Sequence, residues 1–105
     1  MKVTAWNNGS HHSTGAGYGF KIKIEDRDAH FDRSWGTVEV ELPTGEIVES
    51  NIAKDSFWGA KCRELIDQQF GIWLLDRNLA PWQKGSPPVF ELEHISGNRF
   101  RLSET

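Results

Sequence analysis

The sequence predicts an α+β fold: a small antiparallel sheet or open pseudobarrel of about six strands, with one or two helices between the hairpins. Three observations lead to this prediction. Short segments that alternate apolar and polar residues recur along the chain, as in strands with one buried face. Turn residues join these segments into neighbouring pairs, which is typical of antiparallel hairpins. A stretch with apolar residues at helical spacing lies between the central pair and the last pair.

The first two strands are expected at 2–6 and 18–24. The sequence KVTAW alternates polar and apolar residues, as a short strand does. In YGFKIKI the aromatic and aliphatic residues share one face, and Lys21 and Lys23 share the other. This pattern indicates a half-buried strand.

The clearest unit is a β-hairpin at 37–52. TVEVEL alternates, PTGE supplies turn residues, and an apolar pair then begins the returning strand. One face of this hairpin is expected to be wet and acidic. The highly charged segment 25–35 before it is expected to be a helical turn or a loop, attached to the core by Phe31 or Trp35.

A helix is expected over 57–70, capped by Asp55 or Ser56. The apolar residues of FWGAKCRELIDQQF fall at helical spacing, which places Cys62 on the buried face. IWLLDRN is expected to continue this helix or to form a second one, which Asn78 ends in the left-handed region.

The C-terminal part is expected to form an irregular segment and a second hairpin. The segment 80–88 holds three of the four prolines, which disfavour regular structure. VFELEHI then alternates, SGN supplies a turn, and RFRL returns. No repeat or linker divides the chain, so residues 1–105 are expected to form a single domain.

Composition limits the possible partners and compartments. Twelve basic and 15 acidic residues give a net charge of −3, which disfavours a strongly basic nucleic-acid binder but leaves room for a local basic face. A single cysteine forms no disulfide framework. No apolar run is long enough for a membrane helix, and the first residues lack the pattern of a secretion signal. A cytoplasmic protein with no membrane partner is therefore expected.

The glycine-rich stretch WNNGSHHSTGAGYGF, residues 6–20, is the first candidate site. It lacks the third glycine and the following helix of a dinucleotide fingerprint, and it lacks the Gly-Lys-Ser/Thr end of a phosphate-binding loop. Two interpretations remain open. The stretch is a mobile connection whose glycines let it cross a neighbouring strand closely, or it is a loop that contacts a ligand.

No metal, no other cofactor and no catalytic group are expected. His11 and His12 would point to opposite sides of a strand, and no Cys, Asp or Glu lies within seven residues of them. His30 and His94 are the other histidines. Three aspartates between 26 and 32 are interleaved with arginines, which is typical of a self-neutralised surface.

Cations at alternate positions suggest nucleic-acid binding. Lys21 and Lys23 share one strand face, and Arg99 and Arg101 share another. If those strands are neighbours, four cations line one surface suited to phosphates. The polar side chains of the first loop would then add hydrogen bonds, from Asn7, Asn8, Ser10, His11 and His12. Alternatively, these positions are polar only because one face of a sheet is wet.

The second half of the chain resembles the B3-like DNA-binding pseudobarrels of plant transcription factors and some restriction enzymes. The matching residues are Gly71, Trp73, Leu79, Gly85, Phe90, Leu92 and Phe100. The resemblance covers about a third of the chain and implies a pseudobarrel that binds DNA. The chain departs from the family in having Ser-Pro-Pro after Gly85 and in lacking two basic arms. It also resembles small bacterial proteins, which implies no activity.

These observations favour a non-enzymatic binding module with duplex DNA as its partner. The alternative is a protein-interaction or dimerisation domain, because aromatic residues are enriched at interfaces. Three tryptophans in or beside loops would serve that role: Trp6, Trp35 and Trp82. An enzyme that uses the glycine-rich loop on a small ligand is the least favoured hypothesis.

Overall fold

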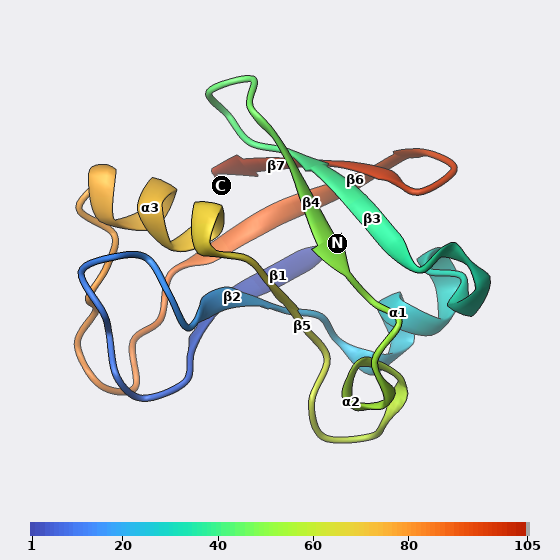
Figure 1. Cartoon of the computed structure of the whole chain (residues 1–105), viewed down its shortest axis with the longest axis horizontal. Helices are drawn as coiled ribbons and strands as arrows, with labels where there is room; N and C mark the ends of the chain where they lie inside the picture. Colours follow the sequence, from blue (N-terminus) through green and yellow to red (C-terminus); the bar gives the residue numbers. More distant parts are fainter. Residues whose placement is uncertain (105) are drawn as a thin grey trace.

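The structure, a computed structural model, describes residues 1–104 and has the α+β fold that the sequence predicts. Seven strands form one sheet in the order β4-β3-β7-β6-β1-β2-β5 (Figure 1). All neighbouring strands are antiparallel except β3 and β7, which are parallel. The strands are β1 (Lys2–Asn7), β2 (Tyr18–Lys21), β3 (Thr37–Glu41), β4 (Ile47–Asn51), β5 (Glu64–Ile66), β6 (Val89–Ser96) and β7 (Arg99–Glu104). The helices are α1 (Ile24–His30), the 3-10 turn η1 (Arg33–Trp35), α2 (Asp55–Trp58) and α3 (Gln68–Asp76).

The sheet curls into a nearly closed barrel. Its two edge strands, β4 and β5, approach each other, and the Ser50 hydroxyl donates a hydrogen bond to the Ile66 carbonyl at 3.2 Å. In Figure 1, α3 and the first loop lie at one end of the barrel, whereas α1 and α2 lie at the other. The alternation predicted from the sequence is confirmed, because the residues that point inward are buried. They include Phe20, Ile22, Val40 and Leu92.

The prediction of a helix over 57–70 is wrong. The segment forms the one-turn helix α2, an irregular stretch at 59–63 and the strand β5, which pairs with β2. Its apolar residues satisfy the helical period, but Leu65 is buried because it lies opposite Phe20 inside the barrel. Cys62 is consequently exposed rather than buried. The helix expected after this segment is present as α3, and Asn78 follows it with φ of 59°, as predicted.

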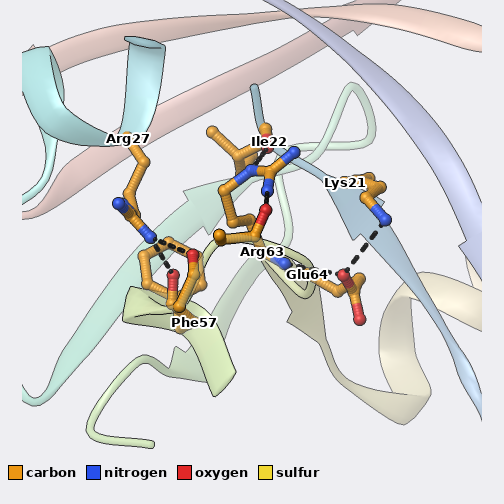
Figure 2. A network of polar contacts seen from close by, with 8 residues as sticks. Lys21, Ile22, Arg27, Phe57, Arg63 and Glu64 are labelled. Atoms are coloured by element: carbon orange, nitrogen blue, oxygen red, sulfur yellow. Dashed lines mark hydrogen bonds and ion pairs between the residues drawn. The ribbon is translucent and has the colours of Figure 1, made fainter. Parts of the chain in front are cut away.

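Arg27 of α1 is buried, although the sequence pattern suggested a charged surface at 25–35. Its guanidinium Nη1 donates hydrogen bonds to the carbonyls of Phe57 and Gly59, at 2.9 and 2.7 Å (Figure 2). These bonds satisfy carbonyls at the C-terminal end of α2, so Arg27 joins the two helices at this end of the barrel. Phe31 is buried as expected, and the half-buried Trp35 packs against the core.

The first loop, residues 8–17, is packed on α3. A Cβ atom on Gly71 of α3 would overlap the carbonyl group of Gly15, and a Cβ on Gly15 would lie 2.7 Å from the Gln68 carbonyl. The Gln68 side chain also donates a hydrogen bond to the Thr14 carbonyl at 2.8 Å. Glycines here permit backbone-to-backbone contact, so the loop is held in place and is not a free connection.

We expect Gly71→Ala to destabilise the fold by about 1–3 kcal/mol, because the added methyl group forces the loop and α3 apart. Urea denaturation measures the loss. Gly59→Ala is the matched control, since the nearest atom to a Cβ on Gly59 is 3.6 Å away. Equal stability of the two variants would contradict the close packing of the loop on α3.

Candidate nucleic-acid interface

Two asparagines shape the start of the first loop. Asn7 Oδ1 accepts hydrogen bonds from the backbone N–H groups of Gly9 and His11, at 2.7 and 3.2 Å. Asn8 Oδ1 accepts one from Ser10 N–H at 3.1 Å, and Asn8 N–H donates to the Gly17 carbonyl at 2.9 Å. The amide of Asn7 therefore organises the loop from inside.

His11 anchors the loop to the end of the barrel. Its Nδ1 is 2.8 Å from the Tyr18 hydroxyl, and its ring meets those of Tyr18 and Trp82 edge to face, with centroids 5.4 and 5.1 Å apart. Burial raises the pKa of the Tyr18 phenol. His11 therefore helps to hold the loop, whereas Asn8, Ser10 and His12 are exposed.

The outward side chains of β1 and β2 form a continuous surface, which we call the β1–β2 face. Strand register places Thr4 opposite Lys21 and Trp6 opposite Gly19. Continuing the same register brings Lys2 opposite Lys23, just beyond the end of β2. The face comprises Lys2, Thr4, Trp6, Gly19, Lys21 and Lys23.

Lys2 was not among the residues selected from the sequence. The sequence could have identified it, because the alternation of KVTAW places Lys2, Thr4 and Trp6 on one side of the strand. Lys61, which the sequence pattern placed on the outward face of the expected helix, was not grouped with these lysines either.

The segment 59–63, which contains Lys61, is bonded to Ile22 next to Lys23. Arg63 Nε donates to the Ile22 carbonyl, and Ile22 N–H donates back to the Arg63 carbonyl, both at 2.8 Å (Figure 2). The exposed Lys61 therefore lies in the stretch that runs next to Lys23. Among residues 1–104, neither lysine has a carboxylate within 4 Å.

One cation of the face is partly compensated. Lys21 Nζ lies 3.8 Å from a carboxylate oxygen of the buried Glu64, which the sequence pattern had placed outward on a helix. Desolvation by burial lowers the pKa of the nearby Lys54 amine, against the attraction of Glu64. Lys21 is still more than a third exposed, so its charge is available to a partner.

The expectation that four cations line one surface is wrong. Strands β6 and β1 separate β7 from β2, so Arg99 and Arg101 do not adjoin the lysine pair. Parallel pairing of β3 with β7 instead places Arg99 2.9 Å from Glu39 and Arg101 3.5 Å from Glu41. Strand register adds two more glutamates to this surface, Glu49 opposite Glu39 and Glu93 opposite Arg101. The outer side of β7 is therefore acidic overall and unsuited to phosphates.

The three tryptophans differ in their surroundings. Trp35 and Trp82 are partly buried and pack against the core, which leaves less of their surface for an interface than the sequence suggested. Trp6, which is also partly buried, lies in β1 next to the first loop, as expected, and it points outward from the barrel opposite Gly19. It is the aromatic residue of the β1–β2 face.

Gly19, opposite Trp6, is buried against β5. A Cβ there would overlap the Leu65 carbonyl and lie 3.1 Å from an Ile66 side-chain carbon. Strands β2 and β5 thus approach closely because position 19 has no side chain.

We also searched the described residues for a pocket, a metal-ligating group and a membrane-spanning helix. Within residues 1–104 there is no pocket and no group of three or more metal-ligating side chains. No helix in this range is long and apolar enough to cross a membrane. Comparison of the chain with known family models, curated proteins and solved structures finds no match.

Because burial raises the pKa of Tyr18 above its usual value of about 10, the unfolded chain loses this proton first. The free energy of unfolding should therefore fall as pH rises through about 10. Urea denaturation across this range, with phenolate absorbance of the single tyrosine, measures both events. At neutral pH, Tyr18→Phe should lower the free energy of unfolding by about 0.5–1.5 kcal/mol, because the bond to His11 is missing. Between neutral and alkaline pH, the free energy of unfolding should fall less in this variant than in the wild type, because the variant has no phenol to ionise. Identical alkaline profiles would contradict the assignment.

Proposed function

We propose that this protein is a nucleic-acid-binding module that holds a single strand along the β1–β2 face. The observation that carries the proposal is the order of groups along one hairpin. From the open end of the hairpin toward its loop, the outward groups are Lys2 and Lys23, then Lys21, then Trp6. The polar first loop follows Trp6. A charged track with an aromatic platform is the arrangement that binds single strands.

The distribution of charge supports this surface over any other on the described part of the barrel. The cations of β7 and the exposed Arg77 are paired with carboxylates at 3.5 Å or less. Lys2, Lys23 and Lys61 have no carboxylate within 4 Å among residues 1–104, although strand register places Glu91 of β6 opposite Lys2. A local field of this kind attracts phosphates even when the net charge of the chain is −3.

A single strand fits the face better than duplex DNA, the partner expected from the sequence. The bases of a duplex are stacked inside the helix, whereas those of a single strand can stack on an aromatic ring. Trp6 lies outward on β1 opposite Gly19 and is partly exposed, so its ring is within reach of a base. The helix α3 has no lysine or arginine with which to enter a major groove.

The B3-like resemblance of the second half supports nucleic-acid binding in general. The barrel-like sheet agrees with the fold that the resemblance implies. In this proposal, however, the contacts lie on the first hairpin, outside the residues that carry the resemblance.

We expect Lys21→Gln with Lys23→Gln to weaken binding of a labelled single-stranded oligonucleotide about tenfold at low salt. The slope of log affinity against log salt should decrease by about 1.4, because two phosphate contacts are lost. Fluorescence anisotropy at several salt concentrations measures both quantities. Arg99→Gln with Arg101→Gln is the matched control, since it removes the same charge from the acidic surface and should leave binding within twofold. Equal losses from the two double variants would overturn the assignment of the face.

Trp6→Leu tests the choice of a single strand. We expect affinity for a single strand to fall about tenfold, since stacking contributes roughly 1–3 kcal/mol per base, while weak duplex binding changes little. Ile47→Ala is the control for loss of an exposed apolar side chain, because Ile47 lies on the other side of the barrel in β4. Tighter binding of duplex than of single strand by the wild type would contradict the proposal.

A further inference from the structure

Two histidines from distant parts of the chain face each other at the end of the barrel away from the first loop. His30 is the last residue of α1, and His94 lies in β6. Their Nδ1 atoms are 3.4 Å apart, and their rings are perpendicular, with centroids separated by 5.5 Å. Both side chains are only partly buried, so solvent and ions can reach them.

The surroundings of His94 determine which of its nitrogens has a free lone pair. Nε2 lies 2.7 Å from the Gly97 carbonyl, which can only accept, so Nε2 carries the proton. In the neutral ring Nδ1 is then unprotonated and faces His30. Histidines that bind metals commonly donate their other ring N–H to a backbone carbonyl in this way.

Packing also holds the His94 ring in position. It stacks on Phe100 with centroids 4.6 Å apart and planes inclined by 16°, and Phe31 stacks on Phe100 at 4.5 Å. Trp35 meets the His94 ring edge to face at 6.0 Å. The nitrogen that faces His30 is therefore placed by the core and does not depend on a flexible side chain.

The distance between the two nitrogens suits a bridging ion better than a direct hydrogen bond. A well-formed N–H bond joins atoms about 2.9–3.0 Å apart, which is shorter than the 3.4 Å observed. Two nitrogens at 2.0–2.1 Å from a tetrahedral ion lie about 3.3–3.4 Å apart. Neighbouring nitrogens in a square-planar complex would lie only about 2.8–2.9 Å apart.

We propose that His30 and His94 bind one Zn²⁺ ion through their Nδ1 atoms. Among residues 1–104 no third His, Cys, Asp or Glu completes the group, so water occupies the other tetrahedral positions. On binding, the proton on His30 Nδ1 moves to Nε2 of the same ring, and both rings remain neutral. With two protein ligands, the site should bind Zn²⁺ more weakly than a four-ligand structural site does.

Imidazole resonances test this site directly. In a two-dimensional proton–nitrogen spectrum of ¹⁵N-labelled protein, ZnCl₂ should shift the Nδ1 signals of His30 and His94 together, along a single one-site binding curve. The exposed His12 serves as an internal reference and should not shift in this range. No shift of the pair in tenfold excess Zn²⁺, or an earlier shift of His12, would overturn the proposal.

Variants separate loss of the site from loss of the fold. His30→Gln should weaken Zn²⁺ binding at least tenfold in calorimetry, and His94→Phe should do the same while keeping a ring stacked on Phe100. His12→Gln is the matched control and should bind like the wild type. Backbone amide spectra establish that each variant is folded. Unchanged affinity in folded His30→Gln or folded His94→Phe would show that the ion binds elsewhere.

Discussion

The parallel pairing of β3 with β7 is the constraint on which the barrel depends. It joins residues about 60 positions apart in the chain, with Val40 opposite Phe100. The turn before β7 strengthens it, because Asn98 donates a side-chain hydrogen bond to the Thr37 carbonyl at 3.0 Å and accepts one at its own carbonyl from Glu39 N–H. Without this pairing the hairpin of β3 and β4 would separate from the other five strands, and the β4 edge could no longer approach β5.

The same pairing determines where free positive charge remains. It aligns Glu39 with Arg99 and Glu41 with Arg101, which neutralises the cations of β7. On the β1–β2 side, strand register places Glu91 of β6 opposite Lys2, and Glu64 lies 3.8 Å from Lys21, whereas Lys23 has no carboxylate within 4 Å among residues 1–104. The location of the proposed interface is therefore a consequence of strand order and cannot be deduced from the number of basic residues.

Alternation in the sequence predicted most of the strands because it reports a local property, the direction of each side chain. It identified the buried faces of β2, β3, β6 and β7, including Phe20, Val40 and Leu92. It could not reveal that β3 and β7 are parallel neighbours, since that depends on contacts between distant segments. It also failed at 57–70, where three residues of β5 are too few to show alternation and the helical period matched by coincidence. Alternation placed Lys21 and Lys23 on one outward face, but the position of Arg99 and Arg101 relative to them depends on strand order, which alternation does not report.

The glycines of the first loop illustrate how composition and geometry carry different information. Their spacing matched no phosphate-binding motif, and the structure shows that Gly15 serves to pack the loop against Gly71 of α3. His11 and the Asn7 amide hold the loop from the other side. The exposed groups of Asn8, Ser10 and His12 are consequently presented by an ordered backbone beyond Trp6. A partner that reached them from the β1–β2 face would meet a surface already in place, so little of its binding free energy would be lost in ordering the loop.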